Sequence, residues 1–146
     1  AQYFLGHSTR LSAHVSVAEN GADAEAGMLI SYKGGRFATL AAGLTTPGPG
    51  RFVLLGTEGW AELPPRFHHP DRVIIHPAQG ESRQVRPTVQ GRGYGYEFLE
   101  VNRCLREGRT ESAIMPLEDT LEVMNHMQQA LETIGSPVTE DDDLAI

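Results

Sequence analysis

Residues 10–17 read Arg-Leu-Ser-Ala-His-Val-Ser-Val, an alternation of apolar and polar side chains. In a β-strand, successive side chains point to opposite faces of the sheet. Leu11, Ala13 and Val15 therefore face one side, and His14 and its serine neighbours face the other. The segment predicts a strand with one buried face.

Further strands follow this one along the chain. Residues 24–32 keep the same alternation, Lys33-Gly34-Gly35 predicts a turn because glycine reaches positive backbone angles, and residues 36–44 return as a third strand. The proline- and glycine-rich residues 45–50 predict a connecting loop, because proline donates no ladder hydrogen bond. Beyond this loop, four shorter segments have the composition of strands: 51–56, 60–63, 72–76 and 82–87.

Helices are predicted at the two ends of the chain. Residues 1–5 resemble the last turn of a helix closed by Gly6. Near the other end, a helix with Phe98, Val101, Cys104 and Leu105 on one stripe is predicted to end at Gly108. A second helix should begin at Pro116 and stop at Gly135, with this apolar stripe: Leu117, Leu121, Met124, Met127 or Gln128, Leu131 and Ile134.

Strands followed by helices predict an α+β fold, an open, predominantly antiparallel β-sheet with helices packed on one face. The other face carries Leu29 and Phe37, which are too apolar to remain in water. We expect a second copy of the chain to cover this face, giving a homodimer. Residues 1–136 are expected to form one domain, and residues 137–146 an acidic tail.

Composition excludes several classes of protein. The formal net charge of −7 argues against nucleic-acid binding, which depends on Lys and Arg neutralising phosphates. The chain has neither a membrane-spanning apolar run nor the layout of a signal peptide, so we expect a cytoplasmic protein that does not bind membranes. Cys104 is the only cysteine, which excludes an intrachain disulfide and a four-thiolate zinc site.

Several residues suggest chemistry, but their context favours other roles. His68 and His69 are adjacent, so in an extended chain they point apart and are not expected to hold a metal together. His14 is expected to be a packing or interface residue. Cys104 lies among apolar helical neighbours and is expected to be a buried structural thiol. We therefore expect neither a metal nor a catalytic residue in this chain.

The glycine-rich residues 91–95, Gly-Arg-Gly-Tyr-Gly, precede a predicted helix. They lack the GxGxxG spacing of a dinucleotide site and do not follow the first strand of a βαβ unit. They predict a flexible entry to the helix, from which Tyr94 and Tyr96 project toward a neighbouring pocket.

Four motifs together resemble the carboxy-terminal domain of Gfo/Idh/MocA oxidoreductases, most closely the dihydrodiol dehydrogenase-like branch. In the family's order they are Leu-Leu-Gly-Thr-Glu-Gly at 54–59, Gly-Tyr-Gly-Tyr-Glu at 93–97, Cys-Leu-Arg-Glu-Gly-Arg-Thr-Glu-Ser at 104–112 and Met-Pro-Leu-Glu-Asp-Thr-Leu at 115–121. The resemblance covers nearly the whole chain.

The resemblance implies a parent enzyme with an amino-terminal Rossmann domain that binds NAD or NADP. This enzyme would oxidise or reduce a hydroxyl carbon of a small polyol, meaning a sugar, inositol or diol. The present chain would supply a wall of the substrate pocket, with Arg92, Tyr94 and Tyr96 as substrate-binding residues, and the dimer interface.

The chain departs from the family's pattern in ways that bear on activity. It has no GxGxxG and no Glu-Lys-Pro motif, and Lys33 lies in a turn where it cannot replace the family's catalytic lysine. The chain alone is therefore expected to bind no cofactor and to be inactive. The alternative is a free-standing dimeric α+β module that binds a ligand or a protein without enzymatic activity, or a regulatory relative that lost its chemistry.

Overall fold

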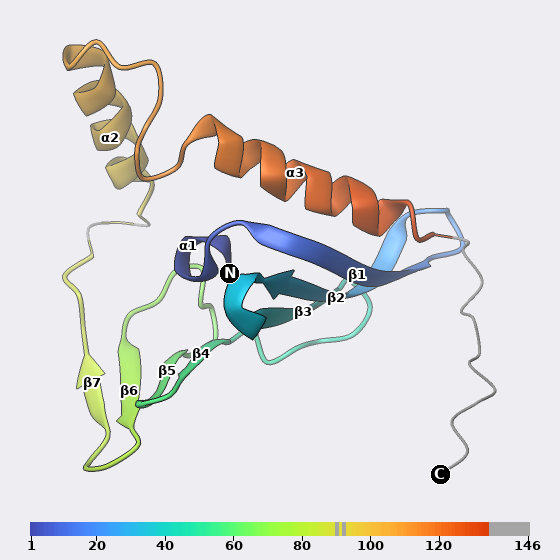
Figure 1. Ribbon diagram of the computed structural model, residues 1–146, viewed down its shortest axis with the longest axis horizontal. Helices are drawn as coiled ribbons and strands as arrows, with labels where there is room; N and C mark the ends of the chain where they lie inside the picture. The colour runs from blue at the N-terminus through green and yellow to red at the C-terminus, as the bar shows by residue number, and fades with distance from the viewer. Residues whose placement is uncertain (90, 92, 135–146) are drawn as a thin grey trace. The chain divides into compact units, whose positions relative to one another are not determined.

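The computed structural model describes residues 1–89, 91 and 93–134 of the chain. These residues form two compact units, which are drawn in Figure 1. Among the described residues, the first unit comprises 1–47 and 113–134, and the second comprises the segment between them.

The first unit is built on a three-stranded antiparallel sheet in the order β1-β2-β3. Its strands are β1 (Ser8–Val17), β2 (Asp23–Tyr32) and β3 (Phe37–Gly43). A short 3₁₀ turn at Lys33–Gly35 joins β2 to β3, and both of its glycines have positive φ, 76° and 74°. The turn predicted from the glycine pair is therefore confirmed.

Two helices accompany this sheet, α1 (Gln2–Leu5) and α3 (Leu117–Leu131). Helix α3 packs on β1 and β2, and Figure 1 shows it lying along one face of the sheet. The side chains buried in this unit come from the covered faces of the two strands and from α3: Val15, Ile30, Tyr32 and Ala130. The face predicted for β1 is thus confirmed.

No described helix packs on the opposite face of this sheet, and we call it the open face. Cross-strand pairing places Ser12, Leu29 and Thr39 in one row across the three strands, and His14 lies opposite Gly27 in the next. Leu29 is 45% exposed and Phe37 is 65% exposed. The open face therefore mixes small, hydroxyl and exposed apolar side chains.

The second unit contains a four-stranded antiparallel sheet in the order β4-β5-β6-β7 and one long helix. The bounds of these elements are β4 (Phe52–Gly56), β5 (Gly59–Leu63), β6 (Val73–Pro77), β7 (Arg83–Val85) and α2 (Tyr94–Arg106). Gly108, with φ 66°, follows α2 as predicted. Cys104 is buried, and its thiol donates a hydrogen bond to Glu100.

The α+β class is confirmed, with open antiparallel sheets and three α-helices in the part of the chain that the structure describes. The structure adds that the strands belong to two sheets. The predicted domain at 1–136 and its acidic tail at 137–146 stay predictions, since residues 135–146, including the predicted helix stop at Gly135, lie outside the described part. Among the described residues, no helix has the length and apolarity needed to cross a bilayer.

Helix α3 differs from expectation in the face that it turns inward. The apolar stripe that includes Leu117, Leu121 and Met124 is exposed. The covered line consists of positions 119, 122, 126 and 130, of which only Ala130 is apolar. The polar members of this line bind the chain that enters β1, and these bonds fix the orientation of the helix.

Candidate functional site

The segment joining α1 to β1 lies against the amino-terminal half of α3. Gly6 ends α1 with φ 79°, a conformation that favours glycine, and its N–H donates to the Gln2 carbonyl at 2.8 Å. This bend directs His7 and Ser8 toward the covered line of α3. Side chains more than 110 positions apart in the sequence thereby come together.

Glu122 is the centre of this cluster, with a side chain that is 15% exposed. It accepts hydrogen bonds from the Ser8 backbone N–H at 2.6 Å, from His7 Nδ1 at 2.5 Å and from Gln2 Nε2 at 3.2 Å. Gln2 Nε2 also donates to Asp119 at 2.9 Å. Charge-assisted bonds of this kind are stronger than neutral ones, so Glu122 fastens α3 to the start of β1.

The two partners of this ion pair have pKa values shifted in opposite directions. Burial alone would raise the pKa of Glu122, but the hydrogen bonds from Ser8 and His7 outweigh burial and hold it below its usual value. The hydrogen bond to Glu122, reinforced by its negative charge, raises the pKa of His7. Both groups are therefore charged when the pH lies between the pKa of Glu122 and the pKa of His7.

His126, Ser8 and Glu122 resemble a catalytic triad in composition but not in geometry. His126 Nε2 lies 2.7 Å from the Ser8 hydroxyl, and the Glu122 carboxylate is 3.8 Å from the same nitrogen. In a triad the carboxylate binds the other ring nitrogen, so that the imidazole can accept the serine proton. This arrangement therefore does not activate a nucleophile. We call the hydrogen-bonded cluster the latch, because it holds α3 against the start of β1; its members are Gln2, His7, Ser8, Asp119, Glu122 and His126.

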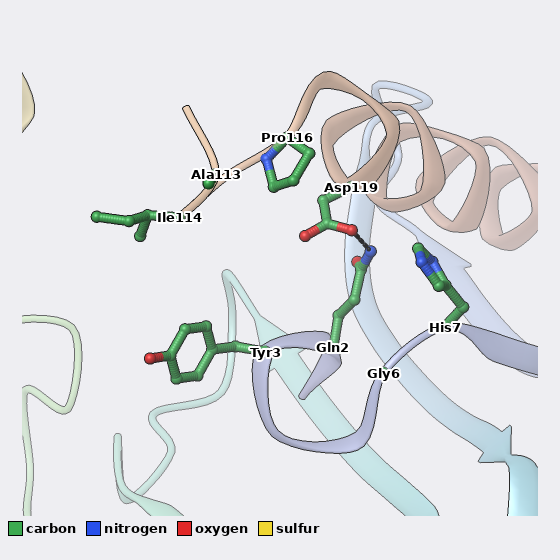
Figure 2. Close-up of a pocket in the computed structure, with 8 residues that line it drawn as sticks. All are labelled: Gln2, Tyr3, Gly6, His7, Ala113, Ile114, Pro116 and Asp119. Atoms are coloured by element: carbon green, nitrogen blue, oxygen red, sulfur yellow. Dashed lines mark hydrogen bonds between the residues drawn. The ribbon is translucent and has the colours of Figure 1, made fainter. Parts of the chain in front are cut away.

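A cavity of about 480 Å³ opens beside this latch, within the first unit. Figure 2 shows the residues that line it, with Tyr3 and Ile114 at the side away from the latch. The lining residues come from α1, from the chain that follows it, from the segment leading into α3 and from the first turn of α3: Gln2, Tyr3, Gly6, His7, Ala113, Ile114, Pro116 and Asp119. The cavity thus combines a carboxylate and an amide with apolar walls.

Two of the three substrate-binding residues expected from the sequence, Tyr94 and Tyr96, belong to the described part of the second unit. Tyr94 and Tyr96 lie in the first turn of α2 and are both exposed, and the Tyr96 hydroxyl donates to the Thr88 carbonyl at 3.5 Å. Arg92 lies outside the described residues. The role of these three residues therefore stays a prediction.

The remaining candidates show no catalytic arrangement. His14 is exposed on the open face. His68 and His69 lie between β5 and β6, and no group of three or more His, Cys, Asp or Glu among the described residues could hold a metal ion. Gly93 precedes α2 with φ 91°, a left-handed conformation that favours glycine, and the predicted flexibility of this glycine-rich entry stays a prediction.

The sheet of the second unit also has an aromatic pair. Trp60 on β5 and His76 on β6 are cross-strand neighbours with stacked rings, 3.7 Å between centroids. His76 Nδ1 lies 2.8 Å from the Ser82 hydroxyl, and Leu55 on β4 extends the same row. This row is a partly exposed apolar surface rather than a reactive centre.

Sequence reasoning did not identify the latch or the cavity. Asp119, Glu122 and His126 recur at helical spacing, which was a usable signal for a polar face on α3. Their partners Gln2 and Ser8 carry no local pattern that indicates a contact with a helix at the far end of the chain.

No family model matches the chain. It is 30% identical over 125 residues to a trans-1,2-dihydrobenzene-1,2-diol dehydrogenase of Xenopus tropicalis, a match that covers 80% of this chain and 37% of the relative. The enzyme of the same name from Mus musculus is 26% identical over 140 residues, covering 90% of this chain and 41% of the relative. The chain thus spans about two-fifths of the length of these relatives.

Solved structures share the fold at low sequence identity. An aldose-aldose oxidoreductase from Caulobacter crescentus complexed with glycerol has a TM-score of 0.72 and 14% identity, covering 87% of this chain and 39% of that one. An oxidoreductase from Agrobacterium radiobacter in complex with NAD+, L-tartaric acid and magnesium has a TM-score of 0.71 and 15% identity, covering 92% and 43%.

The dihydrodiol dehydrogenase relatives and the oxidoreductase fold agree with the motifs at residues 54–59, 93–97, 104–112 and 115–121. The chain is therefore similar in sequence to dihydrodiol dehydrogenases over 80% or more of its length, and it shares its fold with part of the solved Gfo/Idh/MocA oxidoreductases.

Proposed function

We propose that the chain is the substrate-side and dimer-forming domain of an NAD(P)-dependent oxidoreductase that acts on a hydroxyl carbon of a sugar, inositol or diol in the cytoplasm. The similarity to diol dehydrogenases over 80% or more of the chain is the observation that carries this proposal. The chain contributes the wall of the substrate pocket, and a nucleotide-binding half contributes the cofactor.

The described part of the chain does not fit a dinucleotide. Such cofactors bind at the carboxyl ends of parallel strands, above a glycine-rich turn between a strand and a helix. Both described sheets are purely antiparallel. NAD or NADP would therefore be bound by the other part of the proposed enzyme.

The proposed substrate wall consists of Arg92 and the phenols of Tyr94 and Tyr96. Phenol groups donate and accept hydrogen bonds, and their rings pack against the carbon skeleton of a polyol or diol. The exposure of both tyrosines at the start of α2 supports this role.

The open face of the first sheet is the proposed dimer interface. Leu29 and Phe37 are exposed there among small side chains that let a second sheet approach closely. Light scattering of the purified chain should give the mass of a dimer. Leu29→Glu should give a monomer, whereas Leu44→Glu, at an exposed position beyond the end of β3, should leave the dimer intact; a wild-type monomer would contradict the interface.

A chimera tests the enzymatic part of the proposal. The chain would replace the matching segment of the Xenopus tropicalis enzyme, and cofactor reduction would be measured with trans-dihydrodiols and a polyol panel. We expect activity from the chimera and none from the chain alone. In the chimera, Tyr94→Phe and Tyr96→Phe should raise KM more than they lower kcat.

Two results would overturn this proposal. One is a chimera that folds and binds cofactor but turns over no substrate, which would favour the free-standing binding module. The other is appreciable turnover by the chain without a nucleotide-binding half. The reading frame upstream of residue 1 gives an independent test, because GxGxxG and Glu-Lys-Pro motifs are expected there.

A further inference from the structure

The open face of the first sheet is a grid in which each row crosses the three strands. The pairing of the strands gives every row one residue from β1, one from β2 and one from β3. In order along β1, the rows are Arg10, Ser31 and Phe37; Ser12, Leu29 and Thr39; His14, Gly27 and Ala41; and Ser16, Glu25 and Gly43. The grid therefore defines which side chains a second copy would meet.

A projection and a hollow lie next to each other at the centre of this grid. Leu29 projects from the second row and is 45% exposed. Gly27 follows it on β2 in the third row, and a Cβ added there would meet no atom within 4 Å. Ala41, beside Gly27 on β3, contributes only a methyl group. The hollow at Gly27 is therefore open to a side chain from another molecule.

The arginine and the carboxylate of the grid lie at opposite ends. Arg10 belongs to the first row and Glu25 to the last. The Glu25 carboxylate accepts hydrogen bonds from the hydroxyls of Thr45 and Thr46, which follow β3. These bonds hold the negative charge at its end of the face, so the two ends differ in charge.

A two-fold axis can relate two aligned sheets that face each other in two ways. An axis parallel to the strands lays each row over the same row of the partner. In that arrangement Glu25 lies against the partner's Glu25, and the hollow at Gly27 lies against the partner's Gly27. Like charges then meet at one end, and a void remains near the centre.

An axis across the strands makes the strands of the two copies antiparallel and reverses the order of the rows. When all rows overlap, the second row of one copy lies on the third row of its partner. Leu29 then fills the hollow at the partner's Gly27. The first row lies on the last, which brings Arg10 to the end that carries the partner's Glu25. Both contacts occur twice by symmetry.

We propose that two copies of the chain associate through the open face with their strands antiparallel, with Leu29 of each copy in the Gly27 hollow of the other. Complementary size at the centre and complementary charge at the ends both favour this register. The register rests on the dimer of the proposed function and specifies how its two copies recognise each other.

The Glu25→Gln variant distinguishes the two arrangements by the sign of its effect on the dissociation constant of the dimer, measured by sedimentation equilibrium on the full 146-residue chain. Glutamine keeps an acceptor for the hydroxyls of Thr45 and Thr46 but removes the charge. We expect the dimer to weaken about 5-fold, because attraction to the partner's Arg10 is lost at both ends. The control Glu19→Gln, in the turn after β1, should change the constant by less than about 2-fold. An unchanged or tighter dimer in Glu25→Gln would overturn the register.

The Gly27→Val variant is a second test in which the two arrangements again predict opposite signs. A Cβ at this position is unobstructed within the chain, but valine occupies the hollow that the partner's Leu29 enters. The dimer should therefore weaken by at least about 10-fold. With parallel strands, the two valines would instead fill the central void and tighten the dimer. The control is Gly48→Val, in an exposed loop where an added Cβ also meets no atom within 4 Å.

The outcomes separate the register from the dimer itself. A wild-type monomer would overturn the dimer of the proposed function and this register with it. A wild-type dimer that either Glu25→Gln or Gly27→Val leaves unchanged or tightens would overturn the register alone. Circular dichroism verifies that each variant folds, and if Gly27→Val does not fold, the sign of the effect of Glu25→Gln decides.

Discussion

Replacing Glu122 by glutamine tests whether one carboxylate fastens α3 to the first strand. The variant keeps the size of the side chain and one acceptor oxygen but loses the charge. Glu122 binds the Ser8 N–H, Gln2 Nε2 and His7 Nδ1. Glutamine can accept only part of this set, and only as neutral hydrogen bonds.

The expected loss follows from these bonds. A hydrogen bond to a charged group contributes about 1.5–3 kcal/mol and a neutral one about 0.5–1.5 kcal/mol. The Ser8 and Gln2 bonds should each lose roughly 1 kcal/mol, and the exposed His7 pair adds little because solvent screens it. We therefore expect Glu122→Gln to lower the free energy of unfolding by about 2 kcal/mol, and Tm by roughly 6 °C for a chain of this size.

Urea unfolding followed by circular dichroism gives this difference, with Glu118→Gln as the matched control. Glu118 lies on the same helix and is exposed, and its side chain has no hydrogen bond to another described residue. The free energy of unfolding of Glu118→Gln should therefore stay within about 0.5 kcal/mol of the wild-type value. Amide exchange at Ser8 should also accelerate in Glu122→Gln and remain slow in the control.

The dependence on pH provides a second, independent check. The pKa of Glu122 is lowered in the folded state, so its contribution is present above the unfolded-state value of about 4.3 and is lost as pH falls through the folded-state value. The pKa of His7 is raised, so its smaller contribution is present below about 6.5 and lost as pH rises through its folded-state value. The difference between wild type and Glu122→Gln should therefore be largest near pH 5–6. Equal stability of the two glutamine variants at that pH, or a difference that persists in strong acid, would refute the latch.

Three further outcomes follow from the geometry. Gly59→Ala should destabilise the second unit by at least about 2 kcal/mol in urea unfolding, because Gly59 has φ 136° and an added Cβ would collide with the His76 carbonyl; a loss below about 0.5 kcal/mol would contradict the close approach. The Glu100 carboxyl should titrate by NMR with a pKa of about 2, because the Arg103 hydrogen bond dominates its lowering, and Arg103→Ala should raise that pKa; an unchanged midpoint would assign the shift to other groups. Ile30→Ala should lower the free energy of unfolding by about 3 kcal/mol in thermal unfolding, since the Ile30 side chain is 5% exposed between the sheet and α3. A near-neutral result would show that the core collapses into the space that the substitution leaves.

The strands were predictable because their signals are local. The alternation in residues 10–17 defines both the strand and its buried face, and the glycine pair after Lys33 defines a turn. The separation into two sheets was not predictable in this way, because strand pairing depends on tertiary contacts that a single segment does not encode. The loop at residues 45–50 marks the boundary between the units, but its composition alone indicates only a connection.

The inward face of α3 shows where periodicity misleads. Leu117, Leu121 and Met124 form the more apolar stripe, so hydrophobic pattern alone selects them as the core face. In the structure the line of Asp119 and Glu122 faces inward instead, where these partly buried carboxylates accept hydrogen bonds from Gln2 and Ser8. That choice depends on partners at the opposite end of the chain.

The same orientation leaves two apolar surfaces exposed on the first unit, the open face and the stripe of α3. A two-fold symmetric dimer buries the same patch of both copies, and α3 packs on the face of the sheet opposite to the open face. A dimer through the open face therefore leaves the stripe uncovered in both copies. This chain covers 37–41% of the length of its relatives, which are therefore about two and a half times longer. Under the proposed function, the stripe is available for contact with the additional parts of the enzyme. Because polar residues occupy most of the covered line of α3, the apolar side of the helix stays exposed and is free to make a second contact.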